Sequence, residues 1–297
     1  MESPQPPSGD TPAYRRLALT HDLYIRRLSG VLLERVPLQA GDPIGRWVPY
    51  VLYHHIFQLS RATSSLVKLG YSEETLPLGR ALISSTMNIM FIVGSENPEG
   101  WALRFWLQLG ELEQRMLARE SRLERFDRAV IERLATEGAE AAEGAIAAHI
   151  RDGGIYPDKL VPPRARRPNP ATWHGLSDRG LAISLGLLDW YETEYDYLST
   201  VTHAQSIAVQ ASGQAIMRGE TLVCGPHFRA PLLALTSSIS AMKYASLAIM
   251  KHYDLAAADP EFQALNNSMT EAINRYREES GGNDGVRAVF GRLPEQQ

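Results

Sequence analysis

Apolar residues recur at intervals of three and four along most of this chain, which is the spacing of one face of an α-helix. In the first such segment, residues 12–36, leucine, isoleucine and valine are mixed with paired arginines before a turn rich in proline and glycine. A second segment runs over residues 44–68 and closes at Gly70, where glycine is a common stop for a helix. The pattern therefore predicts two amphipathic helices in the first quarter of the chain.

Later segments carry the helical pattern to residue 279. Residues 78–91 are almost wholly apolar, which is typical of a central helix, whereas arginine, glutamate and alanine dominate residues 101–148. Several opposite charges in this second stretch stand four residues apart, an arrangement that supports a partly exposed helix. Apolar periodicity returns at residues 228–252 and 261–279. Few stretches alternate apolar and polar residues as a strand would, so a helical protein is expected.

Two stretches interrupt the helical pattern. Glycine and proline are frequent in residues 152–172, which predicts a long loop, and two short apolar runs in residues 215–224 predict a small β-hairpin. The two ends, residues 1–11 and 280–297, are polar and rich in proline or glycine, which is typical of loose tails. The predicted fold class is thus all-α: a single multi-helix, bundle-like domain over residues 12–279 with one small hairpin.

Polar side chains gather on one face of the helix that is predicted through residues 189–203. Steps of three and four residues separate them, which places them along one side of a helix. They are Asp189, Glu192, Asp196, Ser199 and His203. Such a face supports acid/base chemistry, an ion, or only a solvated surface. His203 is the candidate catalytic residue, with Ser199 one turn before it, because histidine exchanges a proton near neutral pH. A structural histidine, hydrogen-bonded on both sides, is the alternative.

Arg80 is a second candidate, since it stands in the middle of the apolar segment 78–91. A guanidinium in such a place is costly unless it is paired or binds an anionic group. Arg80 is therefore expected either to anchor an anionic ligand or to form a buried ion pair with Asp196 or Glu192. Asn88 lies on the same helical face and would orient a ligand by hydrogen bonding.

Three short motifs follow one another in an order that resembles a known family. They are Arg80 in an apolar helix, Trp173-x-Gly175, and Tyr195-x-x-Leu198-Ser199-x-x-x-His203. Over residues 45–250 the chain resembles a large, mostly bacterial, all-helical family catalogued only as a domain of unknown function. The resemblance places Trp173 with Arg80 and His203 as a ligand-binding residue. The family pattern has a glutamate four residues after the arginine, where this chain has Ser84, so an activity that used that carboxylate is in doubt.

A helical fold with an arginine and a histidine is also similar to the HEPN ribonucleases. In that group the arginine precedes the histidine by four to six intervening residues, but no arginine lies between Gly180 and Thr202. Arg16 with His21 and Arg167 with His174 fit the spacing, although such matches arise by chance in an arginine-rich chain. The likeness is therefore an analogy of fold class.

Composition and charge narrow the classes further. The 297 residues are 44% hydrophobic and 22% charged, which is ordinary for a soluble globular protein, and the net charge of −4 gives no overall attraction to nucleic acid or to an anionic membrane. The basic stretch 159–167 is the best local positive cluster, with a solvated linker as its alternative. A lone cysteine, Cys224, fits a reducing compartment. No signal peptide and no apolar run of the ~20 residues that a membrane span needs is found, so a cytoplasmic protein without a membrane partner is expected.

Common catalytic signatures do not occur in the sequence: no phosphate loop, no dinucleotide fingerprint, no nucleophile elbow and no His-Glu-x-x-His. No cofactor is predicted. A divalent metal on Asp189, Glu192 and Asp196 stays as an alternative, because hard cations bind clustered carboxylates.

Three classes of function remain open. The first is a pocket for a small anionic or phosphate-bearing ligand, or for RNA, with hydrolytic acid/base chemistry. The second is a non-catalytic helical interaction or regulatory protein, and the third is a metal-dependent enzyme. A homo-oligomer is left open in each.

Overall fold

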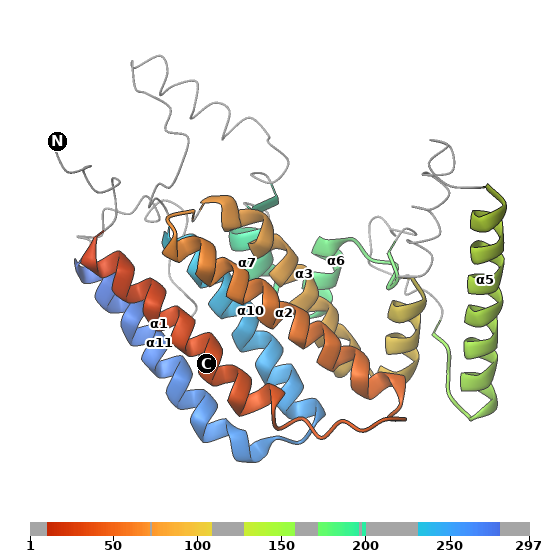
Figure 1. Ribbon diagram of the computed structural model, residues 1–297. Helices are drawn as coiled ribbons and strands as arrows, with labels where there is room; N and C mark the ends of the chain where they lie inside the picture. Colours follow the sequence, from red (N-terminus) through yellow and green to blue (C-terminus); the bar gives the residue numbers. More distant parts are fainter. Residues whose placement is uncertain are drawn as a thin grey trace. The chain divides into compact units, whose positions relative to one another are not determined.

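The computed structural model describes residues 11–71, 73–108, 128–157, 172–195, 198–199 and 231–279. Helices dominate these ranges and no sheet occurs within them, so the all-α class predicted from the sequence is confirmed (Figure 1). The predicted hairpin at 215–224, the basic stretch 159–167 and the C-terminal tail 280–297 lie outside the described residues.

The chain divides into two compact units. The first contains residues 1–37, 52–90 and 182–297, and the second contains residues 38–51 and 91–181. The chain passes from one unit to the other inside three helices, between residues 51 and 52, 90 and 91, and 181 and 182. Each unit is built around its own buried side chains.

Three helices of the first unit pack together along their length. They are α1 (Pro12–Leu28), α10 (Pro231–His252) and α11 (Asp259–Glu279), and α1 and α11 run side by side in Figure 1. Thr11 caps α1 by accepting a hydrogen bond from the Tyr14 N–H, and Pro12 follows at a position that tolerates proline. The Tyr24 hydroxyl donates to Asn266 Oδ1 at 2.8 Å, which ties α1 to α11 inside the core.

Two further long helices are α2 (Ile44–Lys68) and α3 (Leu76–Gly94). The bounds of α2 match the predicted segment, and Gly70 follows with the positive φ of 88° that glycine adopts at little cost. The Tyr53 hydroxyl lies 2.8 Å from Ser246 Oγ, which joins α2 to α10. The Thr86 hydroxyl lies 3.4 Å from the carbonyl oxygen of Ala241, which joins α3 to α10. α10 is thus bonded to both.

Among the described residues, two helices are long and apolar enough, by length and composition alone, to cross a membrane. They are residues 76–94 and 232–252, and 50% and 61% of their most apolar windows are buried inside the protein. The core helix of a soluble protein passes the same test.

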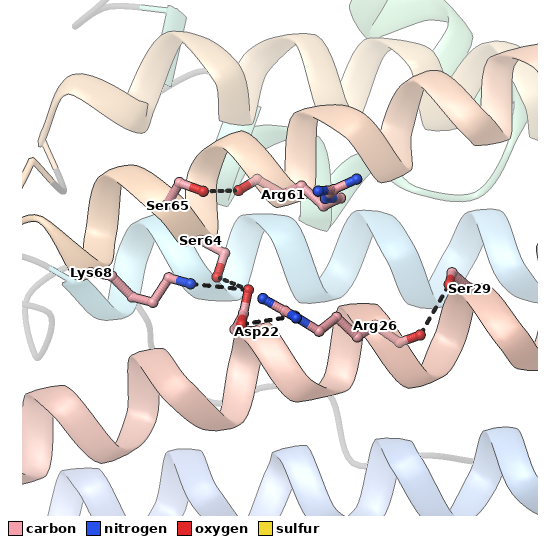
Figure 2. A network of polar contacts seen from close by, with 7 residues as sticks. All are labelled: Asp22, Arg26, Ser29, Arg61, Ser64, Ser65 and Lys68. Atoms are coloured by element: carbon pink, nitrogen blue, oxygen red, sulfur yellow. Dashed lines mark hydrogen bonds and ion pairs between the residues drawn. The ribbon is translucent and has the colours of Figure 1, made fainter.

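Asp22 links α1 to α2 through a network of charged contacts that Figure 2 shows. Its carboxylate lies 3.2 Å from Lys68 Nζ and accepts hydrogen bonds from Ser64 Oγ at 3.2 Å and Arg26 Nε at 3.0 Å. Partial burial by itself would raise the pKa of Asp22, but the Lys68 ammonium, Arg26 and the Ser64 hydroxyl outweigh it, so the pKa lies below its usual range. The ionised carboxylate therefore stabilises the pairing of the two helices.

Replacing Asp22 by asparagine is expected to destabilise the protein by about 1–2 kcal/mol at neutral pH, because the Lys68 and Ser64 contacts lose their charge. Chemical denaturation measures this. Arg26→Gln is the matched control: the Arg26 side chain is 70% exposed, so this variant is expected to change stability by less than about 0.5 kcal/mol. Equal effects of both variants would contradict the role given to the link between α1 and α2.

The second unit contains α5 (Arg128–Arg151), a helical stretch over residues 98–108, and the first half of α6 (Asp178–Ser184). Its core is a cluster of aromatic rings around Trp173. The rings of Phe91, Trp101, Phe105 and His174 all lie with their centroids 5.0–5.9 Å from that of Trp173. Arg104 Nε donates to the Trp173 carbonyl oxygen at 2.7 Å, so the loop that carries this tryptophan is fixed by backbone as well as ring contacts.

Candidate functional site

The segment predicted as one helix over residues 189–203 begins with two short elements. A single α-helical turn, α7 (Leu188–Trp190), passes into a π-helical turn, η3 (Tyr191–Tyr195). Asp189 and Glu192 are exposed, whereas Glu194 and Tyr195 are buried. Asp196 and His203 lie outside the described residues. The two buried side chains of this segment, Glu194 and Tyr195, are therefore not members of the predicted polar face.

Arg80 lies against this segment. Its Nε donates a hydrogen bond to the Tyr195 hydroxyl at 3.2 Å, and its guanidinium carbon stands 5.5 Å from the centre of the Tyr195 ring. Such a cation–π contact restricts the plane of the guanidinium while the hydroxyl fixes its direction. Arg80 is partly rather than fully buried, so it is held in place without being sealed inside the core.

The polar residues of α3 form a partly exposed stripe. Arg80, Ser84 and Asn88 stand at steps of four, and each is only partly buried, while Leu82, Ile83 and Met87 of the same helix are buried. We call Arg80, Ser84 and Asn88 the α3 stripe. The α3 stripe thus places a guanidinium, a hydroxyl and an amide group one after another along the helix.

Gly79 marks where three elements meet next to Arg80. A Cβ at this position would lie 3.0 Å from Leu198 Cδ1 and 3.5 Å from Ser237 Cβ, so the absence of a side chain lets residue 198 and α10 approach α3 closely. Ser199, the predicted partner of His203, follows Leu198 directly and is partly buried. The structure thus brings Leu198 against α3 at Gly79, the residue before Arg80.

Glu194 is a candidate residue that sequence reasoning missed. Only 4% of it is exposed. Burial raises the pKa of its carboxyl to about 7, against the opposite influence of hydrogen-bond donors on Ser237, Trp190 and Ser240. Of these, Ser240 Oγ donates to Glu194 Oε1 at 3.4 Å. A carboxyl with such a pKa exchanges its proton at neutral pH, as acid/base groups do.

Five side chains make up what we call the Glu194 cluster: Trp190, Glu194, Ser237, Ser240 and Tyr244. The Trp190 and Tyr244 rings lie 4.9 Å apart. Burial raises the pKa of the Tyr244 hydroxyl, and the charge of Glu194 adds to that rise. Trp190 Nε1 and Ser237 Oγ approach Glu194 closely enough to lower its pKa, yet neither reaches hydrogen-bond geometry, and Glu194 Oε2 has no partner among the described residues.

The sequence does contain a signal for Glu194. Leu187, Trp190, Glu194 and Leu198 stand at steps of three and four, and the three apolar members are buried. A carboxylate that occupies one position of an apolar stripe is a candidate for a buried titrating group. The polar face predicted over residues 189–203 does not include Glu194, because Glu194 lies on the opposite side of a helix through this segment.

Trp173, predicted as a ligand-binding residue, belongs to the second unit, whereas Arg80, Asn88 and Glu192 belong to the first. Trp173 is buried in the aromatic cluster described above, and Gly175 in the same motif has a positive φ of 80° that suits glycine. His174 accepts a hydrogen bond at Nδ1 from the Leu176 N–H at 3.0 Å, and burial lowers the pKa of His174 to about 4. In this unit the motif carries structural contacts.

A metal site was the third interpretation of the acidic segment. Within the part of the chain that the structure describes, no three histidine, cysteine, aspartate or glutamate side chains come close enough together to hold a metal ion. Asp189 and Glu192 are exposed, and Asp196 lies outside that part. The carboxylate trio therefore stays a prediction from spacing.

In the part of the chain that the structure describes, the protein is all-helical, with a partly buried arginine held by Tyr195 and a buried glutamate, Glu194, one residue before that tyrosine. The chain belongs to a family of unknown function, DUF5677, whose model matches residues 46–214. This match confirms the resemblance drawn from the Arg80, Trp173-x-Gly175 and Tyr195-to-His203 motifs. Comparison with curated proteins and with solved structures found no match.

Proposed function

We propose that this protein binds a small anionic ligand that carries a phosphate or a similar group, on the α3 stripe, with Arg80 as the cationic anchor. The observation that carries the proposal is the contact of Arg80 with Tyr195, which orients a partly buried guanidinium beside a hydroxyl and an amide. Oriented arginine donors match the geometry of phosphate and carboxylate oxygens.

The other two residues of the α3 stripe suit a ligand that has further polar groups besides its anionic group. Ser84 and Asn88 follow Arg80 by four and eight residues, about 6 and 12 Å further along α3. Their hydroxyl and amide groups would hydrogen-bond the parts of a ligand that extend beyond its anionic group. A nucleotide, a sugar phosphate or a short segment of RNA has these dimensions and this chemistry. The proposal places the protein in the cytoplasm and leaves a homo-oligomer open.

Chemistry on the bound ligand would be hydrolytic or transesterifying. Ser199 follows Leu198, which lies against Gly79 one residue before Arg80, and His203 follows Ser199 by four residues in sequence. His203 would act as acid/base and Ser199 would orient it or the ligand. Glu194 is a second acid/base group, since its carboxyl pKa of about 7 suits proton exchange at neutral pH.

Arg80→Gln is expected to weaken the binding of sulfate and of phosphate-bearing ligands by at least about tenfold, because the charged hydrogen bonds of the guanidinium are lost. Isothermal titration of the purified protein with sulfate, mononucleotides and a short RNA measures this, and native mass spectrometry shows any ligand that co-purifies. Arg61→Gln is the matched control, since Arg61 is an exposed arginine whose guanidinium carbon lies 6.0 Å from the Phe57 ring in the same unit. Equal binding by all three proteins would contradict the proposal.

The second candidate is a non-catalytic helical interaction protein, in which the polar residues lock helices together. It is supported by the Tyr195 contact itself, because a stacked and hydrogen-bonded arginine also stabilises the packing of η3 on α3. In that case Arg80→Gln lowers the melting temperature and changes no ligand affinity. The two candidates therefore separate in one set of measurements.

A further inference from the structure

The outer side of α1 in the first unit combines exposed leucines with exposed arginines. The opposite side of this helix is largely apolar and packs into the core. On the outer side, Leu19 and Leu23 stand one helical turn apart and are 56% and 54% exposed. Four exposed arginines surround them. We call the whole set the α1 outer face: Arg15, Arg16, Leu19, Leu23, Arg26 and Arg27.

The arginines of the α1 outer face flank the two leucines on both sides. With about 3.6 residues per turn, Arg15 and Arg26 lie on one side of the leucines, and Arg16 and Arg27 lie on the other. The ion pair between Arg16 and Glu279 agrees with this arrangement, since it places Arg16 on the side of α1 that faces α11. The result is an apolar ridge between two basic flanks.

Positive charge is concentrated on α1, although the chain as a whole has a net charge of −4. Residues 12–28 contain four arginines against one acidic residue, Asp22, and Lys68 of α2 lies 3.2 Å from that aspartate. Two of the arginines have carboxylate partners: Arg16 pairs with Glu279 and Arg26 with Asp22. The side chains of these two arginines are 58% and 70% exposed, and such exposed pairs contribute little. Their guanidinium groups are therefore able to exchange these partners for other anions.

We propose that the α1 outer face binds the surface of a membrane that contains anionic lipids, with Leu19 and Leu23 among the headgroups and the arginines on lipid phosphates. A helix with leucines on one face and basic residues beside them is the kind that lies in such an interface. Arginine packs its apolar stem beside the leucines while its charged end stays at the surface. Basic residues close to an anionic leaflet are attracted to it. Peripheral binding of this kind needs neither an apolar span nor a positive net charge.

Other occupants fit the α1 outer face less well. A second copy of the same face would place arginine against arginine. The two ends of this chain do not match its charge either, since residues 1–10 contain two acidic residues and only one large apolar residue, Met1, and residues 280–297 contain two acidic residues against two arginines. Two half-exposed leucines are a small part of the ~800 Å² that each partner of a stable protein complex buries. A lipid surface needs no matching shape, because anionic lipids move sideways to the arginines.

Co-sedimentation of the full chain with lipid vesicles tests the proposal. Wild type is expected to sediment with phosphatidylcholine vesicles that contain about one third phosphatidylserine, and to stay in solution with pure phosphatidylcholine. High salt is expected to release the protein, because salt screens the attraction between exposed charges. Arg80→Gln, which removes the anchor of the proposed ligand site, is expected to bind the vesicles as wild type does. Vesicle binding is thus measured separately from the function proposed above.

Two double variants of the α1 outer face separate its apolar and basic parts. Leu19→Ser with Leu23→Ser removes the apolar ridge, whereas Arg15→Gln with Arg27→Gln removes one charge from each flank. Each double variant is expected to weaken binding to the anionic vesicles by roughly tenfold or more. The melting temperature is expected to change little, because all four side chains are exposed.

Matched controls come from exposed residues of the second unit. Ile150→Ser with Ile155→Ser removes two apolar side chains that are 55% and 72% exposed. Arg133→Gln with Arg151→Gln removes two exposed arginines of α5 and gives the same change in net charge as the α1 variant. Both controls are expected to bind the anionic vesicles as wild type does.

Several results would overturn the proposal. They are an absence of binding to anionic vesicles, equal binding to neutral and anionic vesicles, wild-type affinity in either α1 double variant, and equal weakening by the controls. A chain that ignores vesicles but binds polyglutamate, with weaker binding in the same α1 variants, would assign the α1 outer face to an acidic protein instead.

Discussion

Replacing Glu194 by glutamine is expected to stabilise the protein by about 3 kcal/mol at about pH 8 and to change its stability little at about pH 4. The ordinary pKa of a glutamate carboxyl is 4.5, and the pKa of Glu194 in the folded protein is about 7. Since the folded pKa is raised, the folded protein binds one more proton than the unfolded chain between these values. Stability contributed by the protonated carboxyl is therefore complete below pH 4.5 and is lost as the pH rises through about 7. Glutamine has the shape of the neutral acid and avoids this loss.

Chemical denaturation of wild type and Glu194→Gln across this pH range measures the difference in unfolding free energy. Glu192→Gln, an exposed neighbour on the same turn, is the matched control and is expected to show no comparable change with pH. Parallel curves for wild type and Glu194→Gln would mean that Glu194 ionises as freely in the folded protein as in the unfolded chain. The pKa of about 7 would then be wrong.

His21→Gln is expected to remove a large acid-dependent loss of stability. His21 is fully buried, and its Nε2 lies 3.1 Å from Ser238 Oγ. Burial lowers the pKa of His21 from 6.5 to about 3, helped by the charge of Lys68 and opposed by that of Asp22. The unfolded chain therefore takes up a proton first as the pH falls below 6.5, and stability is lost until about pH 3. The loss amounts to about 2 kcal/mol at pH 5 and about 5 kcal/mol in full.

The measurement is the slope of unfolding free energy against pH between about 4 and 7, in which any constant cost of the substitution cancels. Glutamine reaches Ser238 as the imidazole does, so the hydrogen bond is kept. His55→Gln, at an exposed position on α2, is the control and should keep the wild-type slope. An unchanged slope in His21→Gln would show that another group causes the acid sensitivity. His174, whose pKa is also lowered by burial, would be the next histidine to replace.

The helical fold could be predicted from the sequence because its signals are local. The bounds of α2 follow from the glycine that stops it, and those of α10 and α11 from Pro260 and the apolar periodicity before and after it. Arg80 could be singled out because a charge in an apolar helix is costly wherever it lies. These inferences needed only the spacing of neighbours along one helix.

The surroundings of Glu194 could not be predicted in the same way. The stripe of Leu187, Trp190, Glu194 and Leu198 indicates a buried position, but the π-helical turn at residues 191–195 changes the angle between successive side chains, so spacing alone does not say which groups Glu194 meets. Which side of that turn faces α10 depends on tertiary packing, including the close approach that Gly79 permits. The Arg80–Tyr195 contact depends on the same packing, and nothing in the spacing of either segment indicates it.

Two adjacent serines of α10, Ser237 and Ser238, lie beside two different buried titrating groups, and the pKa values of those groups define a pH range in which both are uncharged. Ser237 belongs to the Glu194 cluster and Ser238 lies against His21, so one helix separates two buried titrating groups. The imidazole becomes a cation only below about pH 3 and the carboxyl becomes an anion only above about pH 7. Between these limits both groups are uncharged. Physiological pH lies near the upper end of this range. A small change in pH there changes the fraction of Glu194 that is ionised, and with it the charge that α10 packs against.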